Sequence, residues 1–170
     1  MIEFNENEFA PFYANYVTIA NNHLSIIDGL IQQSTLVVEF FKTIPRDKLN
    51  YRYSEGKWTV KDIFLHLIDT ERIFAYRALR IARNDKTDLP GFEENDYVIE
   101  ALAGERSTSS LIEEYKMVRN STICLFKSFS SKQMKRLGIA SNSSVSVRAL
   151  GVIIQGHEKH HLDIIKERYL

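Results

Sequence analysis

The pair His157 and His161 has the residue type and the spacing of a metal-binding site. Residues four apart share one face of a helix, and these two continue an apolar stripe that contains Leu150 and Ile154. An unpaired buried polar group costs roughly 1–3 kcal/mol. A divalent metal ion would satisfy both imidazoles at once, because neutral imidazole is a common ligand for zinc, nickel, copper and iron. Hydrogen bonds to other side chains or to water are the alternative that the pair leaves open.

A catalytic metal site commonly has three protein ligands and one open position, and His66 is the best candidate for the third ligand. It lies between two leucines, so we expect it to be at least partly buried. His160 lies three residues after His157 and could pair with it. We favour His161, because it extends the apolar face while His160 lies toward the flank. His23 lies beside asparagines and is interpreted as a solvated residue.

The segment 157–161 (HEKHH) matches His-Glu-x-x-His, the signature of zinc proteases. Only nine residues follow His161, which leaves little room for the usual downstream ligand, so a protease is disfavoured. The segment also matches the Glu-x-x-His of di-iron bundles, but we find no second copy of it. Glu158 remains a candidate catalytic base or a group that orients a ligand. The alternative is a side chain that faces solvent.

Asp69 and Glu71 follow His66 closely in the sequence. They could orient ligand imidazoles, but salt bridges with Arg72 or neighbouring arginines are the favoured interpretation. Trp58 is predicted to plug the core where the second helix begins. Three arginines at spacings of three are interpreted as a solvated helix face rather than a site for an anionic substrate: Arg77, Arg80 and Arg83.

Four segments carry apolar residues at helical spacing and are predicted to be helices. Their ranges are 22–42, 60–83, 110–129 and 147–169. Thr59 and Asp62 are placed to form a capping box at the start of the second helix. A run of serines offers caps for the third helix, with Glu113 placed for a capping box to Ser110. Ser146 is the predicted cap of the fourth.

These four helices predict an all-α fold, a four-helix bundle, in one domain over residues 1–170. No segment alternates like a strand over more than a few residues. The connection between the second and third helices, residues 84–106, is long. The threading of the bundle therefore stays open, and the connection is compatible with a lid or a short extra helix.

Composition disfavours several other classes of protein. Lys and Arg number 22 and Asp and Glu number 22, so the formal net charge is zero, whereas nucleic-acid binders usually carry a net positive charge. Cys124 is the single cysteine, which excludes a disulfide within the chain. No run approaches the ~18 apolar residues of a membrane span, and no leader pattern is visible. We therefore expect a cytoplasmic protein that binds neither nucleic acid nor membrane.

Five stretches together resemble the DinB-like superfamily of metal-binding four-helix bundles, in particular its YfiT-like branch. The resemblance extends from about Phe12 to Leu170. The stretches are residues 56–62 (GKWTVKD), 66–72 (HLIDTER), 76–85 (YRALRIARND), 89–92 (LPGF) and 156–162 (GHEKHHL).

The resemblance implies one histidine ligand on the second helix and a pair four residues apart on the last. Mapped onto this chain, that set is His66, His157 and His161, the same set that the spacing favours. It also implies bound zinc or nickel and a homodimer. Some relatives resemble thiol transferases that use bacillithiol, mycothiol or glutathione, and others are described as metal-dependent hydrolases.

The sequence therefore leaves two functions open, and it does not identify the small-molecule substrate. In the first, three neutral histidines leave the charge of the metal ion uncompensated, so that it activates water or a low-molecular-weight thiol for attack on an electrophile. In the second, the metal stabilises a non-catalytic bundle that binds a small molecule. A closed tetrahedral site would favour the second, and an open site beside a cleft would favour the first.

Overall fold

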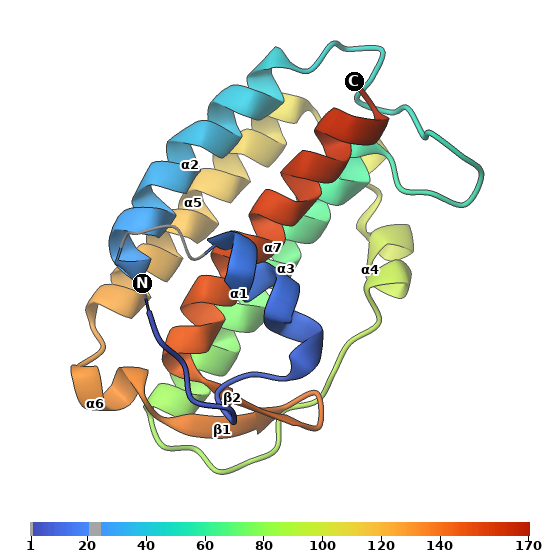
Figure 1. Ribbon diagram of the computed structural model, residues 1–170. Helices are drawn as coiled ribbons and strands as arrows, with labels where there is room; N and C mark the ends of the chain where they lie inside the picture. The colour runs from blue at the N-terminus through green and yellow to red at the C-terminus, as the bar shows by residue number, and fades with distance from the viewer. Residues whose placement is uncertain (1, 21–24) are drawn as a thin grey trace.

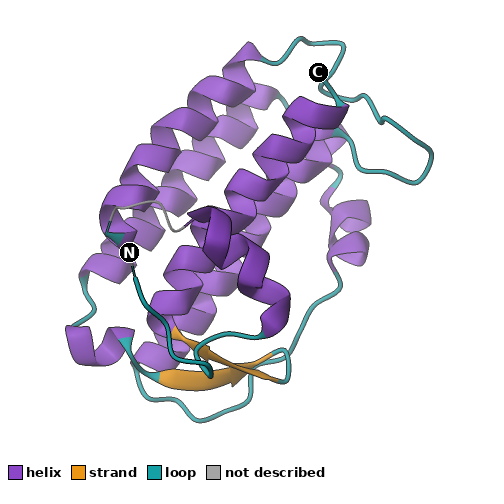
Figure 2. Cartoon of the chain, viewed as in Figure 1, coloured by secondary structure: helices purple, strands orange, loops and turns teal. Residues whose placement is uncertain are grey.

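The computed structural model describes residues 2–20 and 25–170 and shows the predicted four-helix bundle (Figures 1 and 2). The all-α prediction is confirmed. The four bundle helices are α2 (Ile26–Thr43), α3 (Val60–Ala82), α5 (Thr108–Lys127) and α7 (Val147–Arg168). His23, interpreted above as solvated, lies outside the described residues.

The helices are not threaded in simple up-and-down order (Figure 1). Helix α3 packs between α5 and α7, and α2 packs on the same two helices from the other side. Helices α2 and α3, which follow each other in the chain, therefore lie diagonally across the bundle. The long connection between α3 and α5, here called the crossover, returns along the whole bundle before α5 begins. Helices α3 and α5 therefore run in the same direction.

Local capping sets where the helices begin. The predicted capping box of α3 is present, because the Thr59 side chain accepts from the Asp62 amide and the Asp62 carboxylate accepts from the Thr59 amide. Ser146 caps α7, as predicted. The predicted box between Ser110 and Glu113 is wrong. Another serine of the same run, Ser107, caps α5 and accepts from the Ser110 amide, so the helix begins at Thr108, two residues before the predicted start.

The long crossover contains the short helix α4 (Glu94–Ala101), followed by one 3₁₀ turn, η2 (Ala103–Glu105). This agrees with the expectation of a short extra helix between residues 84 and 106. Leu102 joins the two elements in the left-handed conformation, with φ +48°, where a glycine is usual. None of the residues of α4 is buried.

Several short elements were not predicted from the sequence. They are η1 (Pro11–Tyr13), α1 (Ala14–Ala20), α6 (Ser131–Met134) and the strands β1 (Leu137–Ala140) and β2 (Ser143–Ser146). The two strands form an antiparallel hairpin that leads directly into α7. Leu89 of the crossover forms a parallel bridge with Ala140, so the hairpin and the crossover together close one end of the bundle.

The core divides into two apolar clusters along the bundle axis. One includes Phe74 and Ile153 and lies toward the hairpin. The other includes Phe41 and Phe64, whose rings stack at 3.6 Å, and lies at the opposite end. Polar side chains of α3, α5 and α7 are buried between the two clusters. This polar layer contains the candidate functional site.

None of the helices in the described ranges combines the length and the apolar character needed to cross a membrane.

Candidate metal centre

Helices α3 and α7 bring three histidines together: His66 from α3, and His157 and His161 from consecutive turns of α7. The Nε2 atom of His157 lies 3.0 Å from the Nε2 of His66 and 3.2 Å from the Nε2 of His161. One potential ligand atom from each histidine lies within 4.8 Å of the others. The structure therefore places side by side the three residues that the spacing favoured.

The geometry of these three nitrogens fits a divalent metal ion. Tetrahedral zinc with ligands at about 2.0–2.1 Å requires nitrogens roughly 3.3 Å apart, close to the two shortest distances observed. Hydrogen bonding alone fits less well, because the single lone pair or proton on the His157 Nε2 faces two other imidazoles. The donor set is also one that zinc and nickel accept.

Burial keeps the three imidazoles in the neutral form that a metal requires. It lowers the pKa of His66 to about 4 and that of His161 to about 3. The pKa of His157 falls well below its ordinary value, first because of burial and then because His161 and His66 lie close. At neutral pH all three rings can therefore offer a lone pair.

Two neighbours of the cluster restrict the His66 ring. The Thr70 hydroxyl lies 3.4 Å from the His66 Nδ1 atom, one helical turn along α3. If Nδ1 donates to this hydroxyl, Nε2 is left free to bind a metal. The Trp58 ring lies 4.7 Å from the His66 ring and 6.3 Å from the His161 ring, nearly parallel to the latter.

The prediction that Trp58 plugs the core is correct only in part. Its side chain packs against the core cluster of Phe41 and Phe64 but is only half-buried, and its indole N–H donates to Asn95 Oδ1 of α4 at 3.1 Å. The tyrosine ring of Tyr16 on α1 lies on the other side, 5.4 Å from the rings of both His157 and His160. His160 thus flanks the cluster of three without belonging to it.

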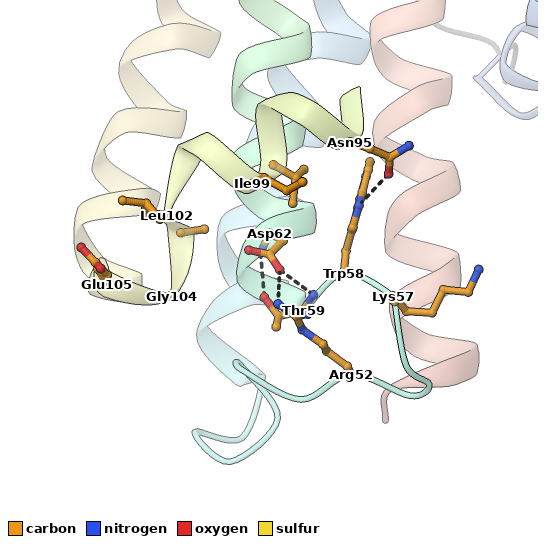
Figure 3. Close-up of a pocket in the computed structure, with 13 residues that line it drawn as sticks. Arg52, Lys57, Trp58, Thr59, Asp62, Asn95, Ile99, Leu102, Gly104 and Glu105 are labelled. Carbon is orange, nitrogen blue, oxygen red and sulfur yellow. Dashed lines mark hydrogen bonds and ion pairs between the residues drawn. The ribbon is translucent and has the colours of Figure 1, made fainter. Parts of the chain in front are cut away.

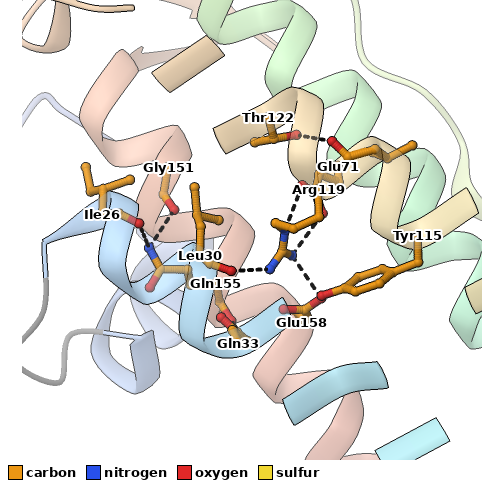
Figure 4. Close-up of polar contacts among 11 residues, drawn as sticks. Ile26, Leu30, Gln33, Glu71, Tyr115, Arg119, Thr122, Gly151, Gln155 and Glu158 are labelled. Atoms are coloured by element: carbon orange, nitrogen blue, oxygen red, sulfur yellow. Dashed lines mark hydrogen bonds and ion pairs between the residues drawn. The ribbon is translucent and has the colours of Figure 1, made fainter. Parts of the chain in front are cut away.

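Glu158 points into the bundle and not to solvent, so the solvated alternative is wrong. Its Oε1 atom accepts from the Tyr115 hydroxyl at 2.6 Å and from Arg119 Nη2 at 2.9 Å (Figure 4). Burial raises the pKa of Glu158 to about 7, although Arg119 opposes the shift. These hydrogen bonds join Glu158 to two buried side chains of α5. Its role as a base in catalysis stays a prediction.

Arg119 is the centre of this network and is fully buried. It donates to both carboxylate oxygens of Glu71, at 2.9–3.1 Å, and to the Leu30 carbonyl at 3.2 Å (Figure 4). The two carboxylates raise its pKa well above the ordinary value, against the opposing effect of burial. A cavity of about 10 Å³ lies between this network and His157.

The favoured salt-bridge interpretation is confirmed for Asp69, which pairs with Arg72 at 3.1 Å. Glu71 also forms a salt bridge, but with the buried Arg119 and not with Arg72. Sequence reasoning missed Arg119, although its position offered a signal. It follows Tyr115 by four residues on α5 and therefore lies on the same, apolar face of that helix.

The prediction that Arg77, Arg80 and Arg83 form a solvated helix face is correct only in part. Arg80 pairs with Asp85, and Arg83 is exposed. Arg77, however, is buried and donates to the Pro90 carbonyl at 2.8 Å and to the Ser141 hydroxyl at 3.0 Å. The crossover and the hairpin supply these two acceptors. The sequence did not predict that either element covers α3.

A four-helix bundle with three converging histidines on two of its helices defines a class of protein that could hold one metal ion. The sequence model of the DinB superfamily matches residues 30–165, and the chain therefore belongs to this superfamily. No protein with a curated description matches the sequence.

Two solved structures share the fold. YfiT from Bacillus subtilis, described as "a probable metal-dependent hydrolase with an unusual four-helix bundle topology", aligns with 98% of this chain and 90% of its own, at TM-score 0.66 and 14% identity. A DinB-like protein from the same organism, YjoA, aligns with 86% of this chain and 90% of its own, at TM-score 0.59 and 16% identity. At these identities the likeness concerns the fold.

Proposed function

We propose that the chain binds one divalent transition metal, zinc or nickel, through His66, His157 and His161 and acts as a metal-dependent hydrolase. The observation that carries the proposal is the convergence of three neutral Nε2 atoms. Among the described residues, these three form the only group of His, Cys, Asp or Glu side chains found close enough to hold an ion. A three-ligand set leaves a position for substrate, which favours an enzyme over a closed structural site.

A divalent ion held here would supply a Lewis acid for an electrophilic substrate. The chain's own residues have separate tasks. The three imidazoles would hold the ion, and Thr70 would orient the His66 ring. Trp58 and Tyr16 flank the histidines from the loop before α3 and from α1.

The description of YfiT as a metal-dependent hydrolase supports this choice by analogy of fold. Thiol transfer with a low-molecular-weight thiol and assembly as a homodimer stay predictions. The alternative function is a metal-stabilised bundle that binds a small molecule without turnover.

Elemental analysis of untagged protein tests the site. We expect about one zinc or nickel ion per chain in the wild type and in His160→Ala, which flanks the cluster, and none in His66→Ala. Wild-type protein that takes up neither metal, or a His66→Ala variant that keeps it, would overturn the proposal.

A screen of ester, amide and phosphoester substrates tests the reaction. We expect turnover by the metal-loaded wild type that His66→Ala lacks. A fully loaded wild type that turns over none of these bonds would favour the non-catalytic alternative.

A further inference from the structure

Helix α4 has an apolar face that packs on no core. Val98, Ile99 and Leu102 recur at helical spacing, yet the side chains of Ile99 and Leu102 are 68% and 58% exposed. Leu102 also keeps a leucine side chain where the backbone conformation favours glycine. An exposed apolar face next to a concave surface is typical of a binding site.

This face lines a cavity of about 580 Å³, within the range of roughly 300–1,000 Å³ that is usual for small-molecule sites (Figure 3). Trp58 forms the opposite wall, and its hydrogen bond to Asn95 fastens α4 to the loop before α3. The cavity is therefore enclosed by an aromatic ring on one side and by aliphatic side chains on the other.

A second cavity, of about 220 Å³, lies beside Trp58 and is lined by His161. The two cavities share four wall residues: Gly56, Lys57, Trp58 and Asn95. Trp58 thus lies between a large cavity that has one aliphatic wall and a small cavity that His161 lines. A molecule whose body occupies the first can extend its reactive group into the second.

The charged groups of the large cavity favour an anionic ligand near Trp58. The Lys57 ammonium has no ion-pair or hydrogen-bond partner among the described residues, and the Arg52 guanidinium lies 3.7 Å from Asp62, a long ion pair. The Asp62 carboxylate is already engaged, because it accepts from the Thr59 amide at 2.8 Å. Glu105 lies at the end of the cavity away from Lys57 (Figure 3).

From these observations we infer that the cavity beneath α4 binds the apolar body of a small organic anion, with the anionic group near Lys57 and the reactive group directed past Trp58 toward His161. The existence of this site does not require a metal. Its assignment as the substrate site rests on the proposed function and names the class of substrate: an aliphatic or aromatic molecule that carries an acidic group.

A suitable probe is anilinonaphthalene sulfonate, which has an aromatic body and one sulfonate. Trp58 is the single tryptophan of the chain, so energy transfer from its indole to the bound dye reports binding at this wall. We expect saturable quenching of the Trp58 emission with one dye per chain, in metal-free and in metal-loaded protein alike.

Two variants with matched exposure test the location. Ile99→Asn should weaken dye binding by about tenfold, because the ligand would bury this side chain. Leu36→Asn, which changes a residue of 60% exposure in the groove between α2 and α7, should leave the affinity unchanged. Equal affinity of Ile99→Asn and wild type, or an equal loss in Leu36→Asn, would overturn the site.

A third variant tests the charge. Lys57→Gln should lower the affinity for the sulfonate dye but leave the affinity for the uncharged analogue phenylnaphthylamine unchanged. An equal effect on both dyes would contradict the anionic class. If His66→Ala loses metal while dye binding persists, the ligand site exists independently of the metal site. If the wild type binds metal but no dye, this inference fails and the proposed function is unaffected.

Discussion

The backbone carbonyl of Tyr16 lies against Gly156 where α1 crosses α7, and a Cβ atom built on Gly156 would be 1.9 Å from that oxygen. No side chain can be accommodated without moving backbone. The missing side chain lets α1 lie directly on the helix that carries two of the three histidines. The close crossing thereby places the Tyr16 ring beside His157.

Gly156→Ala is expected to push α1 away from α7 and to lower the free energy of unfolding by about 1–3 kcal/mol, the usual cost of overpacking. Urea denaturation measures the change. Gly104→Ala is the matched control, because a Cβ there would meet only Asn50 Oδ1 at 4.0 Å. Equal destabilisation by the two variants would contradict the close crossing as the cause.

Arg119→Met is expected to lower the free energy of unfolding by about 3–5 kcal/mol, because it leaves Glu71 buried without its partner. Glu71→Gln should cost less when it is added to Arg119→Met than when it is made in the wild type. A double-mutant cycle in urea measures this coupling. Strictly additive effects would show that the two side chains do not stabilise each other.

The metal-free protein should lose stability as the pH falls below about 6.5. Burial lowers the pKa of His66 to about 4 and that of His161 to about 3, so in this range the unfolded chain binds protons that the folded chain excludes. The contribution of His66 to this loss of stability should grow down to about pH 4, and that of His161 should continue to grow down to about pH 3. It is largely absent above pH 7.

The comparison of metal-free wild type with metal-free His66→Gln, by urea midpoints at pH 7, 6, 5 and 4, isolates the His66 contribution. The wild type should show the steeper decline, by up to about 1.4 kcal/mol per pH unit. Parallel declines in the two proteins would mean that His66 titrates normally in the folded state.

Removal of metal by chelation is expected to lower the melting temperature of metal-loaded wild type, because a ligand that binds only the folded state stabilises it. At a free metal concentration about 100 times Kd the stabilisation is roughly 2.7 kcal/mol. Differential scanning calorimetry with and without chelator measures the shift. His157→Ala should melt at the same temperature in both conditions, and a shift there would point to metal bound elsewhere.

The four long helices could be predicted because each buries a stripe at helical spacing and most begin at a recognisable cap. The histidine pair on α7 could be predicted for the same reason, since its spacing continues such a stripe. The length of the crossover also indicated that it contained structure of its own.

Other features were missed, although the helical spacing of Arg119 from Tyr115 offered a signal. Arg119 and Arg77 are charged, and a charged residue is assigned to solvent unless its partners are known. Their partners lie far along the chain: Glu71 is on another helix, and Pro90 and Ser141 lie in irregular segments. The role of Trp58 likewise depends on α4, which packs across the chain against the loop before α3.

The diagonal placement of α2 and α3 has a consequence for how the chain folds. Neither α2 with α3 nor α5 with α7 packs as a hairpin of neighbouring helices. The antiparallel neighbours are α3 with α7 and α2 with α5, which are not consecutive in the bundle. Forming the first such pair requires closure of a long loop, which has an entropic cost. We therefore expect slower folding than in an up-and-down bundle of equal length, because fewer contacts are local.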